Sequence, residues 1–133
     1  EAINLRIQKR YREMEKNEVR YETYMADDAD YLIVAFGTCA RVSQKAVEMA
    51  RENGIKAGLL RPITLFPFPK DMINQLASSV KGMISIEMNA GQMVEDVRLA
   101  VNGKVPVEFF GRLGGIVPSP DEVYDALVSK LIK

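Results

Sequence analysis

The stretch Gly82–Val101, GMISIEMNAGQMVEDVRLAV, decides the fold class of this chain. Its first half is an apolar run that ends at Glu87, and the residues after Asn89 have the apolar spacing of a helix. A short apolar run that leads directly into a helix is typical of a buried strand in a parallel sheet. The stretch therefore predicts an α/β protein, with polar residues placed where such proteins usually meet ligands and partners.

The same alternation of strand and helix runs through most of the chain. We expect strands at 19–25, 31–37, 56–61 and 81–89, a strand followed by a glycine-rich loop within 105–115, and helices at 40–54, 70–80, 91–103 and 119–133. Thr38 or Ser43 is expected to cap the first of these helices, and Ser119, Pro120 and Glu122 have the pattern of a capping box at the last.

The link between the first two strands is too short for a crossover, so the first strand should run antiparallel to the others. The expected fold is a three-layer α/β/α arrangement around a five-stranded, mostly parallel sheet. We assign residues 1–18 to an N-terminal helical segment and residues 19–133 to the α/β domain. The chain begins with Glu1 rather than Met, which suggests a cut or processed piece.

Composition excludes several classes of function. The 133 residues fit one domain, and 18 basic against 18 acidic side chains argue against binding to nucleic acid or a membrane surface through bulk charge. The sequence has no histidine, which excludes Ser-His-Asp chemistry and His-ligated metal sites within the chain. Its single cysteine, Cys39, cannot form an intrachain disulfide, so we expect a reduced, cytoplasmic setting. We expect no membrane span, because no uninterrupted apolar run is long enough to cross a bilayer.

The residues between the strand at 81–89 and its helix are the first candidate site. Asn89 is a candidate N-cap, and Gly91 allows another part of the backbone to come close. Glu87 ends a buried strand, so its carboxylate needs a partner or a raised pKa. Glu87, Asn89, Gly91 and Gln92 form either a well-made turn or a contact site, and local chemistry alone favours the turn.

Two further loops belong to the same predicted sheet edge. In LLRPITLFPFP, prolines stiffen a loop in which Phe66 and Phe68 either stand exposed as an interface or fold back into the domain. Arg61 either binds a carboxylate or phosphate or pairs with a neighbouring acid. In FFGRLGG, Arg112 and Gly114 follow the last strand, and Arg112 with Glu87 makes either a salt bridge or half of a contact site.

No complete catalytic set is present in these loops. Cys39, next to a predicted helix start, is either a nucleophile with a lowered pKa or a small structural thiol, and the absence of a histidine base favours the thiol.

Four motifs in order and spacing carry a family resemblance: DADYLIVAFGT, GIKAGLLRPITLFPFP, MISIEMNAGQMVEDVR and GRLGG. Over roughly 19–133 the chain resembles the second domain of the α subunit of 2-oxoacid:ferredoxin oxidoreductases, which is similar to the C-terminal domain of transketolase. The resemblance implies an enzyme that oxidatively decarboxylates a 2-oxoacid to acyl-CoA and reduces ferredoxin.

The resemblance also implies how the work is divided within that enzyme. Thiamine diphosphate, Mg and iron–sulfur clusters belong to the whole enzyme, and coenzyme A and ferredoxin are met through the complex. This domain has none of the corresponding motifs, so we expect it to be a non-catalytic assembly domain that binds no cofactor and is inactive alone. Residues Glu87, Asn89, Gly91, Gln92, Arg112 and Gly114 match motif positions and are expected at an interface or active-site edge.

Two other functions stay open at this point. One is the matching domain of a transketolase or of a 2-oxoacid dehydrogenase β subunit. The other is a different class of function, namely a free-standing α/β module that binds a small anionic ligand. A purely structural oligomerisation domain is a further reading, which an exposed apolar loop at Phe66 and Phe68 would support.

Overall fold

Five strands form one sheet in the order β1-β3-β2-β4-β5. In this computed structural model, which describes residues 19–132, the first strand pairs antiparallel with its neighbour and all other pairs are parallel, as predicted. The strands are β1 (Tyr21–Tyr24), β2 (Tyr31–Ala35), β3 (Ala57–Pro62), β4 (Gly82–Glu87) and β5 (Val107–Gly111). The helical segment expected at 1–18 lies outside the described residues.

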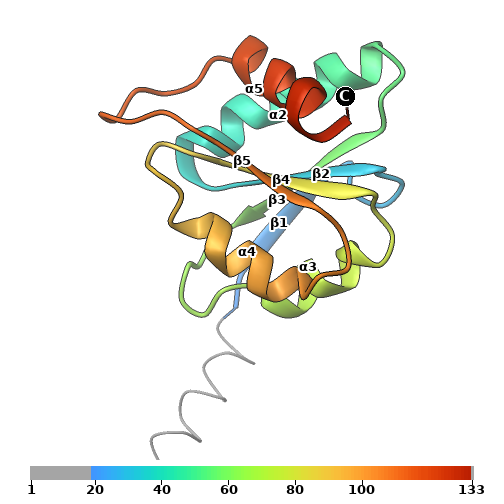
Figure 1. Cartoon of the computed structure of the whole chain (residues 1–133), viewed down its shortest axis with the longest axis vertical. Helices are drawn as coiled ribbons and strands as arrows, with labels where there is room; N and C mark the ends of the chain where they lie inside the picture. The colour runs from blue at the N-terminus through green and yellow to red at the C-terminus, as the bar shows by residue number, and fades with distance from the viewer. Residues whose placement is uncertain (1–18, 133) are drawn as a thin grey trace, which may run out of the picture.

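Helices cover both faces of the sheet, which confirms the predicted three layers (Figure 1). One face, here called the α2 face, carries α2 (Gly37–Glu52) and α5 (Pro120–Ala126), which continues as the π-helix η1 (Leu127–Ile132). The other, the α4 face, carries α3 (Lys70–Ala77) and α4 (Met93–Val101). None of the described helices is both long and apolar enough to cross a membrane.

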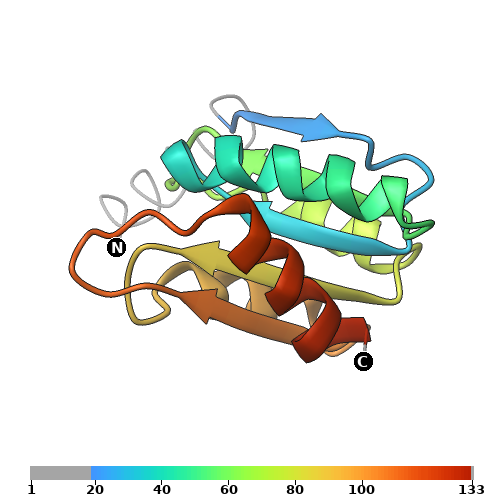
Figure 2. The same ribbon diagram turned by 90° about the horizontal axis from the view of Figure 1, so that it is seen from above.

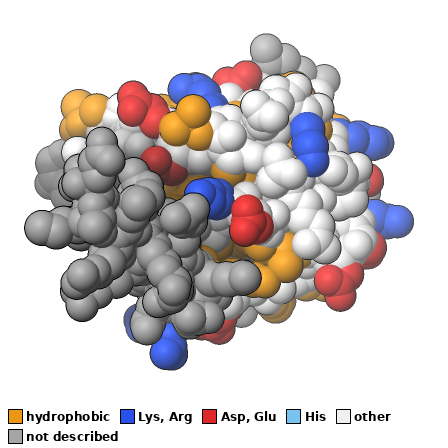
Figure 3. Space-filling view, turned by 90° about the horizontal axis from the view of Figure 1, so that it is seen from below, with side chains coloured by type: hydrophobic (Ala, Val, Ile, Leu, Met, Phe, Trp, Pro, Cys, Tyr) orange, Lys and Arg blue, Asp and Glu red, His pale blue; other side chains and the backbone are white. Residues whose placement is uncertain are grey.

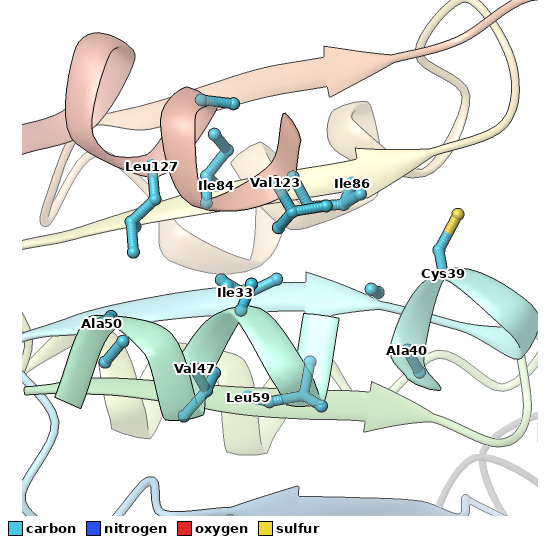
Figure 4. Close-up of a cluster of buried hydrophobic side chains, with 14 residues drawn as sticks. Ile33, Cys39, Ala40, Val47, Ala50, Leu59, Ile84, Ile86, Val123 and Leu127 are labelled. Atoms are coloured by element: carbon cyan, nitrogen blue, oxygen red, sulfur yellow. The ribbon is translucent and has the colours of Figure 1, made fainter. Parts of the chain in front are cut away.

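The central strands are apolar because both of their faces are covered. Every residue of β4 is buried, and so is every residue of β2 except Tyr31. Successive side chains point to opposite faces, so Ile33 packs under α2 with Val47 and Leu127 (Figure 4), whereas Leu32 packs on the α4 face. Two cores result, one on each side of the sheet.

The starts of the helices were predicted with mixed success. The capping box at α5 is confirmed, because the Ser119 hydroxyl accepts from the Glu122 N–H and the Glu122 carboxylate accepts from the Ser119 N–H. The expected cap of α2 by Thr38 or Ser43 is wrong. The helix begins at Gly37, directly after Phe36, so both side chains lie inside the helix, where neither can act as the N-cap.

Candidate functional site

Glu87 is the polar centre of the carboxyl edge of the sheet. Its side chain is 0 % exposed and lies at the end of β4, on the α4 face. One carboxylate oxygen accepts from the Met93 N–H at 2.7 Å, and the other accepts from the Val94 N–H and the Ser85 hydroxyl, both at 3.0 Å. The carboxylate thus satisfies free N–H groups in the first turn of α4 and places negative charge at the positive end of that helix.

Asn89 shapes the turn between Glu87 and the helix. Its side-chain oxygen accepts from the N–H groups of Gly91 at 2.8 Å and of Gln92 at 3.1 Å, which closes a local Asx turn. Gly91 has a φ of +105°, a conformation that L side chains rarely adopt. The expectation that Asn89 is the N-cap is wrong: Gln92 occupies that position without a side-chain cap, and Glu87 supplies the acceptor from a distance.

The end of β5 is fixed against this turn. A Cβ atom at Gly111 would lie 2.4 Å from the carbonyl oxygen of Asn89, so no larger residue fits without a shift of the backbone. The Arg112 N–H donates to the carbonyl oxygen of Glu87 at 3.2 Å. The Arg112 guanidinium, however, pairs with the Glu122 carboxylate on α5, and no ion pair joins it to Glu87 among the described residues.

Arg112 and Glu87 were expected to interact through their side chains, but they are joined only by a backbone hydrogen bond. The physical reason is that Glu87 points into the α4 face, where N–H groups already satisfy it, whereas Glu122 faces Arg112 from the α2 face. Hydrogen bonding from the Ser119 N–H, followed by the bond and charge of Arg112, lowers the pKa of Glu122.

The loop that leaves β5 exposes apolar side chains. Leu113 is 68 % exposed, and Ile116 and Val117 follow after two glycines with positive φ. Figure 2 shows this loop projecting from the carboxyl edge, beyond the ends of the parallel strands. Exposed apolar residues that gather on one edge are more typical of a contact surface than those that are scattered singly.

The loop that leaves β3 adds to the same edge. Phe66 is 65 % exposed, together with Ile63 and Leu65, whereas Phe68 is half-buried and packs against the core of the α4 face. Of the two aromatic residues, one thus stands out as an interface would require and the other folds back into the domain.

Arg61 lies apart from the residues around Glu87. It is in β3, separated from β4 by β2, and its guanidinium lies 3.3 Å from the Glu22 carboxylate on β1. The structure therefore brings together Glu87, Asn89, Gly91, Gln92 and Arg112, and it places Arg61, Phe66 and Phe68 along the other half of the edge. Gly114 lies further out in the loop after β5, where a Cβ atom would meet nothing within 4 Å.

Cys39 is a buried thiol. It belongs to the core between α2 and the sheet (Figure 4) and is 3 % exposed. Burial, and secondarily the negative charge of Glu87, raises the pKa of Cys39. A raised pKa disfavours the thiolate, which argues for the structural role and against a nucleophile.

Charge is spread over the described residues of the face that Figure 3 shows. Seen from below, basic and acidic side chains are interspersed and neither sign forms a patch (Figure 3). Among residues 19–132 no group of three or more acidic or cysteine side chains is placed to hold a metal ion.

Sequence reasoning missed two kinds of residue at this site. Ser85 stands two positions before Glu87 in an otherwise apolar strand, and that spacing, which puts both on one face, was a usable signal. The exposure of Leu113, Ile116 and Val117 had no such signal, because apolar loop residues often fold inwards.

Comparison with known proteins shows which family this chain resembles. The family model described as pyruvate:ferredoxin oxidoreductase core domain II matches residues 29–123. The chain is 52% identical over 115 residues to ketoisovalerate oxidoreductase subunit VorB of Methanothermobacter thermautotrophicus, a match that covers 86% of this chain and 32% of the relative. The chain thus spans about a third of the length of this curated relative.

Two solved structures share the fold. The 2-oxoglutarate:ferredoxin oxidoreductase from Magnetococcus marinus, with 2-oxoglutarate, coenzyme A and succinyl-CoA bound, superposes with a TM-score of 0.71 at 22% identity, covering 81% of this chain and 19% of that one. A split gene transketolase, described as an inactive beta4 tetramer, gives a TM-score of 0.69 at 17% identity, covering 85% and 41%. Both likenesses support the predicted transketolase-like α/β fold.

Proposed function

The chain belongs to the pyruvate:ferredoxin oxidoreductase core domain II family, and on this premise we propose that it is a non-catalytic assembly domain of a 2-oxoacid:ferredoxin oxidoreductase. The proposal takes residues 19–133 as one domain, which contains the matched residues 29–123. It assigns the domain to the α subunit, and to the whole enzyme the oxidative decarboxylation of a 2-oxoacid to acyl-CoA with reduction of ferredoxin.

The residues of this chain do not fit the redox cofactors of such an enzyme. An iron–sulfur cluster is held by four cysteine thiolates, and the sequence has one cysteine, which is buried. We therefore assign thiamine diphosphate, Mg and the clusters to other domains and subunits, in a cytoplasmic complex. Coenzyme A and ferredoxin are partners of that complex, and the isolated domain is expected to be inactive.

The observation that carries the proposal is the carboxyl edge with its exposed apolar loops. Leu113 and Ile116 are 68 % and 51 % exposed on a loop that begins beside the turn braced by Glu87 and Asn89. A rigid base under exposed apolar side chains lowers the entropy lost when an interface forms. This arrangement supports docking of the edge against a neighbouring domain or subunit.

The test uses the purified whole enzyme with Leu113→Ser and Ile116→Ser combined. Loss of buried apolar contacts at an interface weakens association, so the variant should dissociate at about tenfold higher concentration in analytical ultracentrifugation. Its free energy of unfolding should change by less than about 0.5 kcal/mol, since both side chains are exposed.

Leu99→Ser is the matched control. Leu99 is 78 % exposed and belongs to α4 rather than to either loop, so this variant should assemble normally. An intact assembly in the double variant, or equal dissociation in the control, would show that the edge does not carry the contact.

A further inference from the structure

On the α2 face, the described helices do not cover the outer strand of the sheet. β1 pairs with β3, and Figure 2 shows β1 lying outside the strip that α2 covers. Between β1, β3 and α2 lies a groove of about 280 Å³ whose lining includes Glu22, Tyr24, Arg41, Gln44 and Arg61. This volume is at the lower end of the ~300–1,000 Å³ range of ligand pockets, so the groove suits a small group rather than a dinucleotide.

Arg61 lines the groove and has N–H groups that are not used in hydrogen bonds with the described residues. It follows Leu60, which faces the α4 side, so its side chain lies on the α2 face opposite Glu22 in the strand register. Its Nη1 donates to Glu22 at 3.3 Å, while its Nε is buried without a hydrogen-bond partner. The Nε is closed to solvent and therefore to any group in the groove, but the side chain as a whole is 42 % exposed and its Nη2 donates to no described residue. The terminal N–H groups of Arg61 are thus the donors left for an acceptor from outside the described residues.

Arg41 and Gln44 form the opposite wall. They are three positions apart on α2, which puts them on the same side of the helix, and both are exposed. No carboxylate of the described residues lies within ion-pair distance of Arg41. Two guanidinium groups and one carboxylate therefore leave the groove with one uncompensated positive charge.

We propose that this groove binds a small carboxylate, held between Arg41 and Arg61 with Gln44 as an added donor. A planar guanidinium presents two parallel N–H groups that match the two oxygens of a carboxylate. With Glu22 the groove carries one net positive charge, which a monocarboxylate balances, whereas a phosphate dianion would leave one negative charge uncompensated. Arg61 stands beside the loop that leaves β3, but the lining of the groove includes neither Leu113 nor Ile116, on which the test of assembly rests.

The experiment titrates the ¹⁵N-labelled chain with sodium acetate at constant ionic strength and follows the Arg61 Nε–H signal by NMR. The signal should shift and reach saturation. Arg41→Gln should weaken acetate binding by about tenfold, the usual effect of losing one charge-assisted contact. Lys45→Gln, which removes an exposed positive charge from the same helix outside the groove, should leave binding unchanged.

Glu22→Gln removes the carboxylate that competes for Arg61, so it should tighten acetate binding. A variant that only damaged folding could not bind more tightly, so this result distinguishes binding from loss of folding. Inorganic phosphate at about pH 8, where it is largely a dianion, should bind more weakly than acetate. Shifts that never saturate, equal effects of Arg41→Gln and Lys45→Gln, or tighter binding of phosphate would each overturn the proposal. None of these outcomes bears on the assembly function, which is tested separately.

Discussion

At the scale of single residues, Glu87 holds the carboxyl edge together. Its buried carboxylate accepts three hydrogen bonds, two of them from the first turn of α4. In Glu87→Gln an amide NH₂ would face a backbone N–H, so at least one buried donor loses its acceptor. We expect the free energy of unfolding, measured by urea denaturation, to fall by about 2–3 kcal/mol.

Glu95→Gln provides the comparison for Glu87, because Glu95 is an exposed acidic residue in the first turn of the same helix. Its replacement should change the free energy of unfolding by less than about 0.5 kcal/mol. If both variants were equally stable, the carboxylate of Glu87 would not be the group that secures α4.

Cys39 gives a second prediction at this scale. Its burial and raised pKa disfavour the thiolate, which is the form that reacts with alkylating reagents. Iodoacetamide should therefore modify the folded chain at least about tenfold more slowly than the chain in urea, as followed by intact mass. Fast modification of the folded chain would mean that the start of α2 opens readily.

At the scale of elements, most strands and helices could be predicted because their apolar periods differ. The continuous apolar runs of β2 and β4 reflect burial on both faces, which a sequence reveals directly. The capping box of α5 was equally readable, since all its partners lie within four consecutive residues.

The starts of α2 and α4 could not be predicted in the same way. The acceptor for α4 comes from Glu87, several residues away, and the backbone of Phe36 alone begins α2. Likewise, Arg112 pairs with Glu122 rather than Glu87 because of where α5 folds back over the sheet. Such pairings depend on the tertiary positions of elements, which local spacing does not contain.

The start of α5 gives a prediction for pH dependence. The pKa of Glu122 is lowered in the folded chain from its ordinary 4.5, so the folded state binds this proton less tightly than the unfolded state. The resulting stabilisation is present above about 4.5 and is lost as the pH falls through the lowered pKa. Urea midpoints measured from about pH 7 to about pH 3 should therefore fall less in Glu122→Gln than in the unchanged chain.

Glutamine suits this comparison because it retains the capping-box geometry without the charge. Identical acid dependence in the two proteins would contradict the assigned role of Glu122.

At the scale of the whole molecule, Asn89 and Gln92 on the carboxyl edge are expected to have different roles, one in folding and one in contact with a partner. Asn89 accepts two backbone hydrogen bonds, whereas Gln92 is exposed and its side chain caps nothing. Asn89→Ala should therefore cost about 1 kcal/mol of unfolding free energy, and Gln92→Ala almost none. In the whole enzyme the double variant should loosen assembly, measured by ultracentrifugation, by more than this loss of stability explains.

An assembly that stays intact while the domain loses several kcal/mol would show that this turn serves folding alone. Denaturation of the variant domain and ultracentrifugation of the variant enzyme together distinguish the two outcomes.

The position of β1 affects how often its hydrogen bonds open. This strand has four residues and pairs with one neighbour only, so its backbone hydrogen bonds should break more often than those of β2 or β4. Among the described strands, its amide protons should exchange early with deuterium. Because the groove exists only while β1 is in place, a bound carboxylate would hold the strand closed and slow that exchange. The exchange rate of the β1 amide protons would then show whether a carboxylate occupies the groove.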